Sequence, residues 1–132
     1  MHPFRKAVEA ADIDGAIALL ADDVVFVSPV AHKPYAGKAI TAAILRAVFR
    51  VFEDFRYVGE FDGADGRGRE HALLFKTRVG DRDLDGCDFI RHDEHGKIAE
   101  LMVMVRPLSG ANALAEAMGA QFDRIEREAA GG

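Results

Sequence analysis

A single cysteine, Cys87, occurs among the 132 residues of this chain, so no disulfide can form within it. Sparing use of cysteine fits a reducing compartment, and we expect a cytoplasmic protein. Cys87 belongs to no motif that pairs a cysteine with a histidine. We therefore interpret it as a small apolar residue of a strand rather than as a nucleophile.

Clustered positive charge is also missing. The chain carries 17 Lys and Arg against 22 Asp and Glu, and its net charge is −5 at pH 7. Surfaces that bind nucleic acids need clustered Lys and Arg to neutralise phosphates. The absence of such a cluster argues against a nucleic-acid partner.

Long apolar runs are missing as well. No run approaches the roughly 20 residues that span a bilayer, and no hydrophobic segment of signal-peptide length precedes Asp12. We expect no membrane partner. The chain also lacks an internal repeat and a linker, and its length suits a single domain over residues 1–132 with one core.

Helical periodicity marks four segments of the sequence. Apolar spacing predicts helices over residues 3–11, 14–21 and 38–54, the second capped by Asp12, and a final helix over 109–128 that Ser109 can cap. The apolar stripe of the long helix runs through Phe52 and on to Phe55. Residues 129–132 are small, and we expect them to fray.

A period of two marks the remaining segments. It predicts strands over residues 24–28, 56–61 and 70–79, and a hairpin whose strands over 84–91 and 98–106 flank a turn at 93–96. Residues 29–37 are expected to form a loop. This order of elements predicts an α+β fold in which a curved antiparallel sheet wraps around the long helix.

Asp88 is the residue that this pattern singles out. In the first strand of the hairpin, Asp88 alternates onto the more apolar face together with Leu84 and Ile90. Burial raises the pKa of a carboxyl group, which makes Asp88 a candidate proton donor or polar anchor for a ligand oxygen. The alternative is a structural Asp that accepts hydrogen bonds from backbone amides or from an arginine.

The sequence offers two weak metal motifs. Residues 81–86 match the opening of a calcium-binding EF-hand loop, but its twelfth position is His92 and its flanks indicate strands. His92 and His95 are spaced across the tip of a turn, whereas zinc needs three or four fixed ligands. We therefore expect a solvated acidic turn, no metal and no cofactor.

Several short segments, in this order and spacing, carry a resemblance that covers nearly the whole chain. They are residues 11–24 (ADIDGAIALLADDV), 27–30 (VSPV), 35–38 (YAGK), 88–91 (DFIR) and 96–98 (GKI). With them the chain resembles the nuclear-transport-factor-2-like superfamily, in particular its SnoaL-like and ketosteroid-isomerase-like members. The resemblance implies a cone: a strongly curved antiparallel sheet that helices close around an apolar pocket, commonly dimeric through the sheet.

The resemblance also locates family site residues on this chain. Ser28 stands where the isomerases place a general-base Asp, Phe4 where they place an oxyanion-hole Tyr, and Asp88 matches their second, protonated oxyanion-hole group. The acid of the SnoaL-type cyclases falls at Arg106, which with Asp88 supplies part of the Asp-Arg-Asp set of the epoxide-hydrolase branch. Because a serine shuttles no proton without a neighbouring base, we do not expect steroid isomerisation by the family mechanism.

The leading hypothesis is one pocket for a small, largely apolar molecule, with Asp88 as the main polar anchor. The remaining pocket residues that we expect are Ser28, His32, Tyr35 and His71 near the mouth and Phe52, Phe55, Leu73, Phe75, Ile90, Leu101 and Val103 in the walls. One alternative is an isomerase, cyclase or hydrolase that uses Asp88 as acid or base.

The other alternative is a non-catalytic assembly module that buries a partner against the sheet and the final helix. Met102 and Met104 face away from Leu101, Val103 and Val105 and need an apolar cover of their own. We therefore expect a homodimer.

Overall fold

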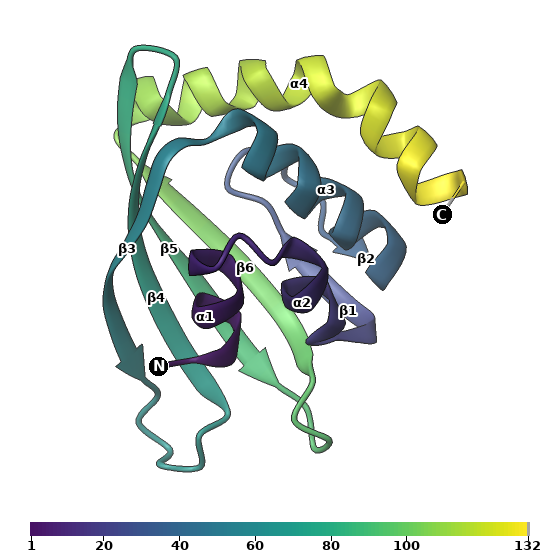
Figure 1. Ribbon diagram of the computed structural model, residues 1–132, viewed down its shortest axis with the longest axis vertical. Helices are drawn as coiled ribbons and strands as arrows, with labels where there is room; N and C mark the ends of the chain where they lie inside the picture. Colours follow the sequence, from purple (N-terminus) through teal and green to yellow (C-terminus); the bar gives the residue numbers. More distant parts are fainter. Residues whose placement is uncertain (132) are drawn as a thin grey trace.

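The computed structural model describes residues 1–131 and shows helices packed on one face of a curved six-stranded sheet (Figure 1). The helices are α1 (Pro3–Glu9), α2 (Ile13–Ala18), α3 (Lys38–Val51) and α4 (Leu108–Gly131). The strands are β1 (Leu20–Val27), β2 (Tyr35–Ala36), β3 (Glu53–Asp62), β4 (Glu70–Val79), β5 (Arg82–His92) and β6 (Ile98–Arg106). The predicted α+β class with a curved sheet is confirmed.

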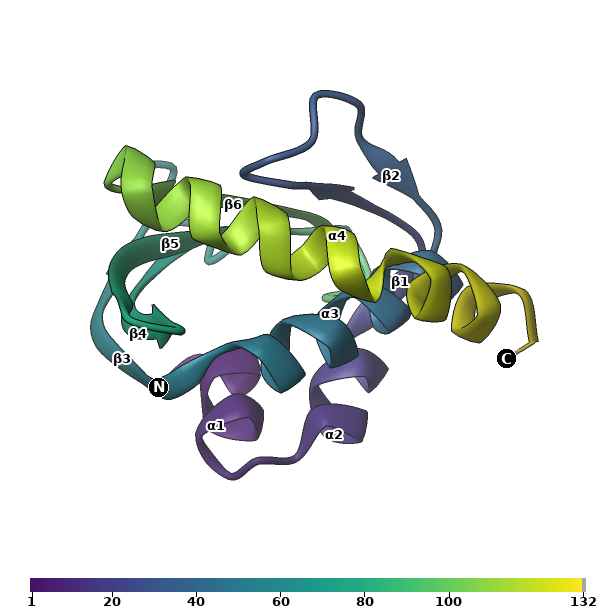
Figure 2. The same ribbon diagram turned by 90° about the horizontal axis from the view of Figure 1, so that it is seen from above.

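The sheet has the strand order β2-β1-β6-β5-β4-β3. Strands β3 to β6 form an antiparallel meander, in which β4 and β5 pair without a register shift from Glu70↔Arg91 to Val79↔Arg82. The pairing of β1 with β6 is parallel, so the sheet is mixed rather than antiparallel throughout as predicted. Seen from above, the meander bends around the helices (Figure 2).

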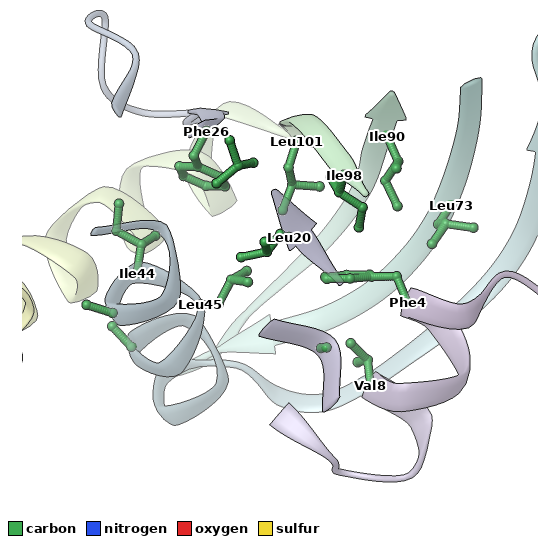
Figure 3. Packing of buried hydrophobic residues seen from close by; sticks show 14 of the residues in the cluster. Phe4, Val8, Leu20, Phe26, Ile44, Leu45, Leu73, Ile90, Ile98 and Leu101 are labelled. Atoms are coloured by element: carbon green, nitrogen blue, oxygen red, sulfur yellow. The ribbon is translucent and has the colours of Figure 1, made fainter. Parts of the chain in front are cut away.

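The two short N-terminal helices lie against the concave face of the sheet. His2 caps α1 by accepting a hydrogen bond from the backbone N–H of Phe4, and Asp12 caps α2 by accepting one from Gly15. Phe4 and Val8 of α1 point toward the buried residues of the sheet (Figure 3). Both side chains belong to the buried core cluster.

The long helix α3 ends at Val51, three residues before the predicted end. The apolar stripe continues through Phe52 and Phe55, but Phe52 has an extended backbone and Phe55 lies on β3. Pairing of Glu53 with Arg78 of β4 begins directly after the helix. Helical periodicity alone predicted another helical turn after Val51, but pairing with β4 makes this segment a strand.

Other element boundaries also differ from the prediction. Leu20, placed in a helix by its spacing, begins β1 and pairs with Ile98. The predicted loop 29–37 contains the two-residue strand β2, which pairs with β1. Residues 129–131 continue α4 instead of fraying, and an ion pair of 3.4 Å joins Arg50 to Glu128; Gly132 lies outside the described residues. None of the helices in this part of the chain is long and apolar enough to cross a membrane.

The core lies between the concave face and the helices. Alternation along β5 is as predicted: Leu84, Asp88 and Ile90 are buried, while Phe89 is on the outer face. Figure 3 shows the central cluster, in which side chains of the sheet meet those of α1 and α3: Phe4, Val8, Leu20, Phe26, Ile44, Leu45, Leu73, Ile90, Ile98 and Leu101. Beside this cluster, under α4, the concave face is not filled.

Candidate functional site

A cavity of about 240 Å³ lies between the concave face of the sheet, α3 and α4. Its walls are almost entirely apolar, and α4 supplies one side of it through Leu114, Met118, Phe122 and Ile125. Pockets for drug-sized ligands typically measure about 300–1,000 Å³, so this cavity suits a small molecule. Its polar groups are few and come from Ser28, Tyr35 and Asp88.

The structure places eight of the twelve residues proposed from the sequence on this cavity: Ser28, Tyr35, Phe52, Phe55, Phe75, Asp88, Leu101 and Val103. Leu73 and Ile90 are buried in the core beside it but do not line it. His32 is exposed on the loop before β2. His71 lies at the start of β4, two residues before Leu73, and contacts His2 and His92 instead of the cavity.

Asp88 lies in the middle of β5, between Leu73 of β4 and Val103 of β6. Its exposed fraction is 8%, and the hydroxyl group of Tyr57 donates a hydrogen bond of 2.8 Å to its Oδ2. The partner is therefore a phenol, and neither a backbone amide nor an arginine holds this carboxyl group in the described residues. Asp88 is at once tied to the core and part of the cavity wall.

The protonation of this pair follows from its surroundings. Burial raises the pKa of Asp88 from 3.8 to about 7, and the hydrogen bond from Tyr57 limits the rise. Burial, and then the charge of Asp88, also raise the pKa of Tyr57, so Tyr57 keeps its proton and remains a donor. Below about pH 7, Asp88 itself carries a proton that it can donate to a ligand oxygen.

Sequence reasoning missed Tyr57. Residues 56–61 were predicted as a strand, and alternation places Tyr57 on the same face as Phe55, which was a signal for an inward hydroxyl group. In the structure Tyr57 pairs with Phe75 of β4, and its hydroxyl group reaches across β4 to β5. This partner could not be identified without the register of three strands.

Four phenylalanines form a connected aromatic wall of the cavity. The ring of Phe55 lies 5.7 Å from Phe49, 5.7 Å from Phe52 and 4.9 Å from Phe75, measured between centroids. The ring of Phe75 lies over Gly86 of β5, where a Cβ atom would collide with it. A glycine at this position is what allows Phe75 to complete the wall.

Ser28 lines the cavity directly after the end of β1. Its Oγ accepts hydrogen bonds from the N–H groups of Val30 and Ala31, at 3.1 and 3.2 Å. Those bonds fix the loop and leave the hydroxyl hydrogen to donate. Because Val27 pairs with Met102, the next residue, Ser28, lies opposite Val103 of β6. Val103 pairs in turn with Asp88 of β5, so two strand spacings separate Ser28 from Asp88, roughly 10 Å.

The chemical capacity of the cavity is limited by these groups. Among the lining residues of the described chain, Asp88 supplies the one carboxyl group, and none is a histidine, lysine, arginine or cysteine. Phe4 lines the cavity at the position where the resemblance expects an oxyanion-hole tyrosine. The arrangement can donate hydrogen bonds to a ligand acceptor and can exchange one proton at Asp88.

Comparisons with known proteins agree with this fold. Residues 2–101 match the family model described as the SnoaL-like domain. A steroid delta-isomerase from Pseudomonas aeruginosa is 46% identical, with a TM-score of 0.84 over 90% of this chain and 85% of that chain. An uncharacterised protein with a cystatin-like fold from Silicibacter pomeroyi is 37% identical, with a TM-score of 0.82 over 92% and 86%.

More distant structures share the fold alone. An NTF2-like protein from Burkholderia xenovorans is 21% identical, with a TM-score of 0.64 over 84% of this chain and 89% of that chain. A comparison with curated proteins gave no match.

Proposed function

This chain belongs to the family of SnoaL-like domains, and from that premise we propose that its cavity binds a small, largely apolar molecule that carries a hydrogen-bond acceptor. The observation that carries the proposal is Asp88, a buried carboxyl group in the wall of an apolar cavity. Tyr57 holds Oδ2, and the protonated carboxyl group donates to the ligand. Ligand pockets commonly combine apolar walls with a few such placed polar groups.

The chemistry of the cavity narrows the ligand class. Asp88 and Ser28 both offer hydrogens, and the aromatic wall offers flat apolar surface. A ketone or a similar carbonyl compound on a ring system of one to three rings satisfies these groups. An anionic ligand does not, because no cationic side chain lines the cavity within the described residues.

The test compares two probes that differ only in the acceptor. Binding of 2-tetralone, a bicyclic ketone, and of tetralin, the hydrocarbon with the same skeleton, is followed by NMR chemical-shift changes of cavity residues. We expect the ketone to bind more tightly at pH 6, where Asp88 is protonated. Between pH 6 and pH 8.5 its affinity should fall on the order of tenfold, because ionised Asp88 no longer donates.

Two variants distinguish the contribution of the Asp88 hydrogen bond to binding from that of the apolar cavity. Asp88→Asn keeps an N–H donor and an acceptor for Tyr57, and we expect it to bind the ketone without pH dependence. Asp88→Leu removes the donor and should bind both probes alike. Equal ketone affinity in the wild type and in Asp88→Leu, or no binding of either probe, would overturn the proposal.

A second candidate function is proton transfer by Asp88. A pKa of about 7 suits a group that accepts and returns a proton near neutral pH, and the similar chain from Pseudomonas aeruginosa is described as a steroid delta-isomerase. In this reading Asp88 acts alone, because Ser28 occupies the position of the family base. Isomerisation of an unsaturated ketone of one to three rings that Asp88→Asn abolishes, while this variant still binds the ketone, would support the enzyme over the binder.

The outer face of the sheet supports a further part of the proposal, a homodimer. Phe61, Ala72, Phe89 and Met102 form one row across β3 to β6, and Leu74, Cys87 and Met104 form the next. Phe61 and Met104 have exposed fractions of 58% and 53%. We assign this face to a second copy of the chain, as the resemblance implies, and the cytoplasm as the location, from the single cysteine. A purely structural assembly module would show this dimer with no ligand in the cavity.

A further inference from the structure

Three histidines that are far apart in the sequence meet at the end of the molecule away from α4. His2 precedes α1, His71 lies at the start of β4, and His92 ends β5. One nitrogen from each ring lies within 4.8 Å of the other two. Sequence reasoning paired His92 with His95 across a turn and found no further ligands, because neither His2 nor His71 is near His92 along the chain.

The hydrogen bonds of this cluster, which we call the histidine cluster, orient two of its rings. Nδ1 of His92 lies 3.0 Å from the carbonyl oxygen of Gly96, and Nδ1 of His71 lies 2.8 Å from Oδ1 of Asp62. Both acceptors require a proton on Nδ1. This leaves Nε2 of His92 as an acceptor for His2, whereas Nε2 of His71 donates to the carbonyl oxygen of Gly68 at 2.9 Å and must release that proton to bind a metal. Supporting bonds of this kind at Nδ1 are a regular feature of metal sites.

His2 is the third member of the histidine cluster, and it can bind a metal only if it loses a hydrogen bond. Its Nδ1 accepts the hydrogen bond that caps α1, so in the absence of metal its Nε2 carries the proton and donates to Nε2 of His92 at 2.8 Å. A metal bound at both Nε2 atoms replaces this shared proton. His2 then needs a proton on Nδ1 and gives up the cap bond to Phe4.

The surroundings favour a cation at this place. Oε2 of Glu60 accepts a hydrogen bond from the backbone N–H of His2, and Asp62 lies against His71. The carboxylates of Glu60 and Asp62 therefore place negative charge beside the three rings.

We propose that His2, His71 and His92 form a binding site for a divalent transition-metal ion, with zinc as the reference ion. Imidazole ligands suit zinc, nickel, copper and cobalt, and three histidines leave the fourth tetrahedral position to water or another ligand. Zn–N bonds of about 2.0–2.1 Å place ligand nitrogens roughly 3.3 Å apart. The His2–His92 pair therefore opens slightly and His71 moves inward, releasing the carbonyl oxygen of Gly68 from its Nε2.

The experiment uses the full chain without a polyhistidine tag. Zn²⁺ is titrated by calorimetry, and Co²⁺ by visible absorption, whose intense bands report tetrahedral coordination. We expect one ion per chain and a higher Tm in the presence of Zn²⁺, because a ligand that binds the folded chain stabilises it.

Three variants locate the site. His71→Asn and His92→Asn each keep a donor near the position of Nδ1 but lack Nε2, and each should weaken Zn²⁺ binding by at least about tenfold. His32→Asn changes an exposed histidine outside the cluster and should bind as the wild type does. Should one of the two cluster variants fail to fold, the other carries the comparison. Equal affinities in the wild type and in both cluster variants, or no binding, would make the cluster a hydrogen-bonded contact only and overturn the proposal.

Discussion

At the scale of single residues, the hydrogen bond between Tyr57 and Asp88 connects the core to the cavity. The phenol stabilises the ionised carboxylate, while burial opposes it, and the pKa of about 7 is the balance of the two. The carboxyl group was predicted on the inward face from alternation alone. Its partner depends on the register of β3, β4 and β5, which one sequence does not reveal.

Removing the phenolic hydroxyl group should change this balance in a known direction. Tyr57→Phe deletes the hydrogen bond that lowers the pKa of Asp88, so that pKa should rise above its wild-type value. A ¹³C NMR titration of the Asp88 carboxyl carbon measures it. Tyr35→Phe is the matched control, because Tyr35 lines the same cavity without bonding to Asp88. An unchanged or lower pKa in Tyr57→Phe would contradict the assignment.

The raised pKa of Asp88 also makes stability depend on pH. Between its unfolded value of 3.8 and its folded value of about 7, the folded chain holds a proton that the unfolded chain has released. Its contribution to the free energy of unfolding therefore falls as pH rises through this window, by on the order of 4 kcal/mol. Asp88→Asn lacks this titration, so its stability should exceed that of the wild type at pH 8 and approach it at pH 4. Urea unfolding measures the free energy of unfolding of both proteins at pH 4 and pH 8. The same difference between the two proteins at both pH values would contradict this prediction.

At the scale of elements, the contact between β4 and β5 shapes the cavity wall. Gly86→Ala places a Cβ atom against the ring of Phe75, and relieving such a clash in a packed core typically costs about 1–3 kcal/mol. Thermal unfolding should show the loss, and ligand affinity should fall because the aromatic wall shifts.

Gly119→Ala is the comparison on α4. A Cβ atom at Gly119 meets nothing within 4 Å, and Ala is favoured over Gly inside a helix by roughly 0.5–1 kcal/mol. We therefore expect Gly86→Ala to lower the free energy of unfolding and Gly119→Ala to raise it. A neutral Gly86→Ala would mean that Phe75 does not occupy the place described.

The prediction of elements succeeded where a local sequence pattern has clear ends. Strands β4 and β6 were found with their observed bounds because their alternation or apolar run ends at clear turn residues or proline. The predicted end of α3 was wrong because Phe52 and Phe55 fit helical spacing as well as they fit a strand. The pairing of Glu53 with Arg78 decides in favour of the strand. The histidine cluster and the Tyr57–Asp88 bond depend on tertiary register, and local patterns carry no information on it.

At the scale of the whole molecule, the exposed rows on the outer sheet face predict a dimer. A mass near twice 14.4 kDa is expected by sedimentation equilibrium at micromolar concentration. Met104→Glu places a charge in the proposed interface and should shift the equilibrium toward single chains. Leu108→Glu changes an apolar residue with an exposed fraction of 75% outside this face and should leave the dimer intact. A single-chain mass for the unsubstituted protein would contradict the dimer.

The parallel pairing of β1 with β6 has a consequence for how the chain folds. Leu20 and its partner Ile98 are separated by α3 and strands β2 to β5 along the chain, whereas β4 and β5 join through a short turn. Contacts of such wide sequence separation form slowly because closing the intervening loop costs entropy. During synthesis the edge of β1 that pairs with β6 therefore stays unpaired until β6 has left the ribosome. Because an unpaired strand edge can pair with other chains, chaperone contact and aggregation are expected to involve this edge of β1.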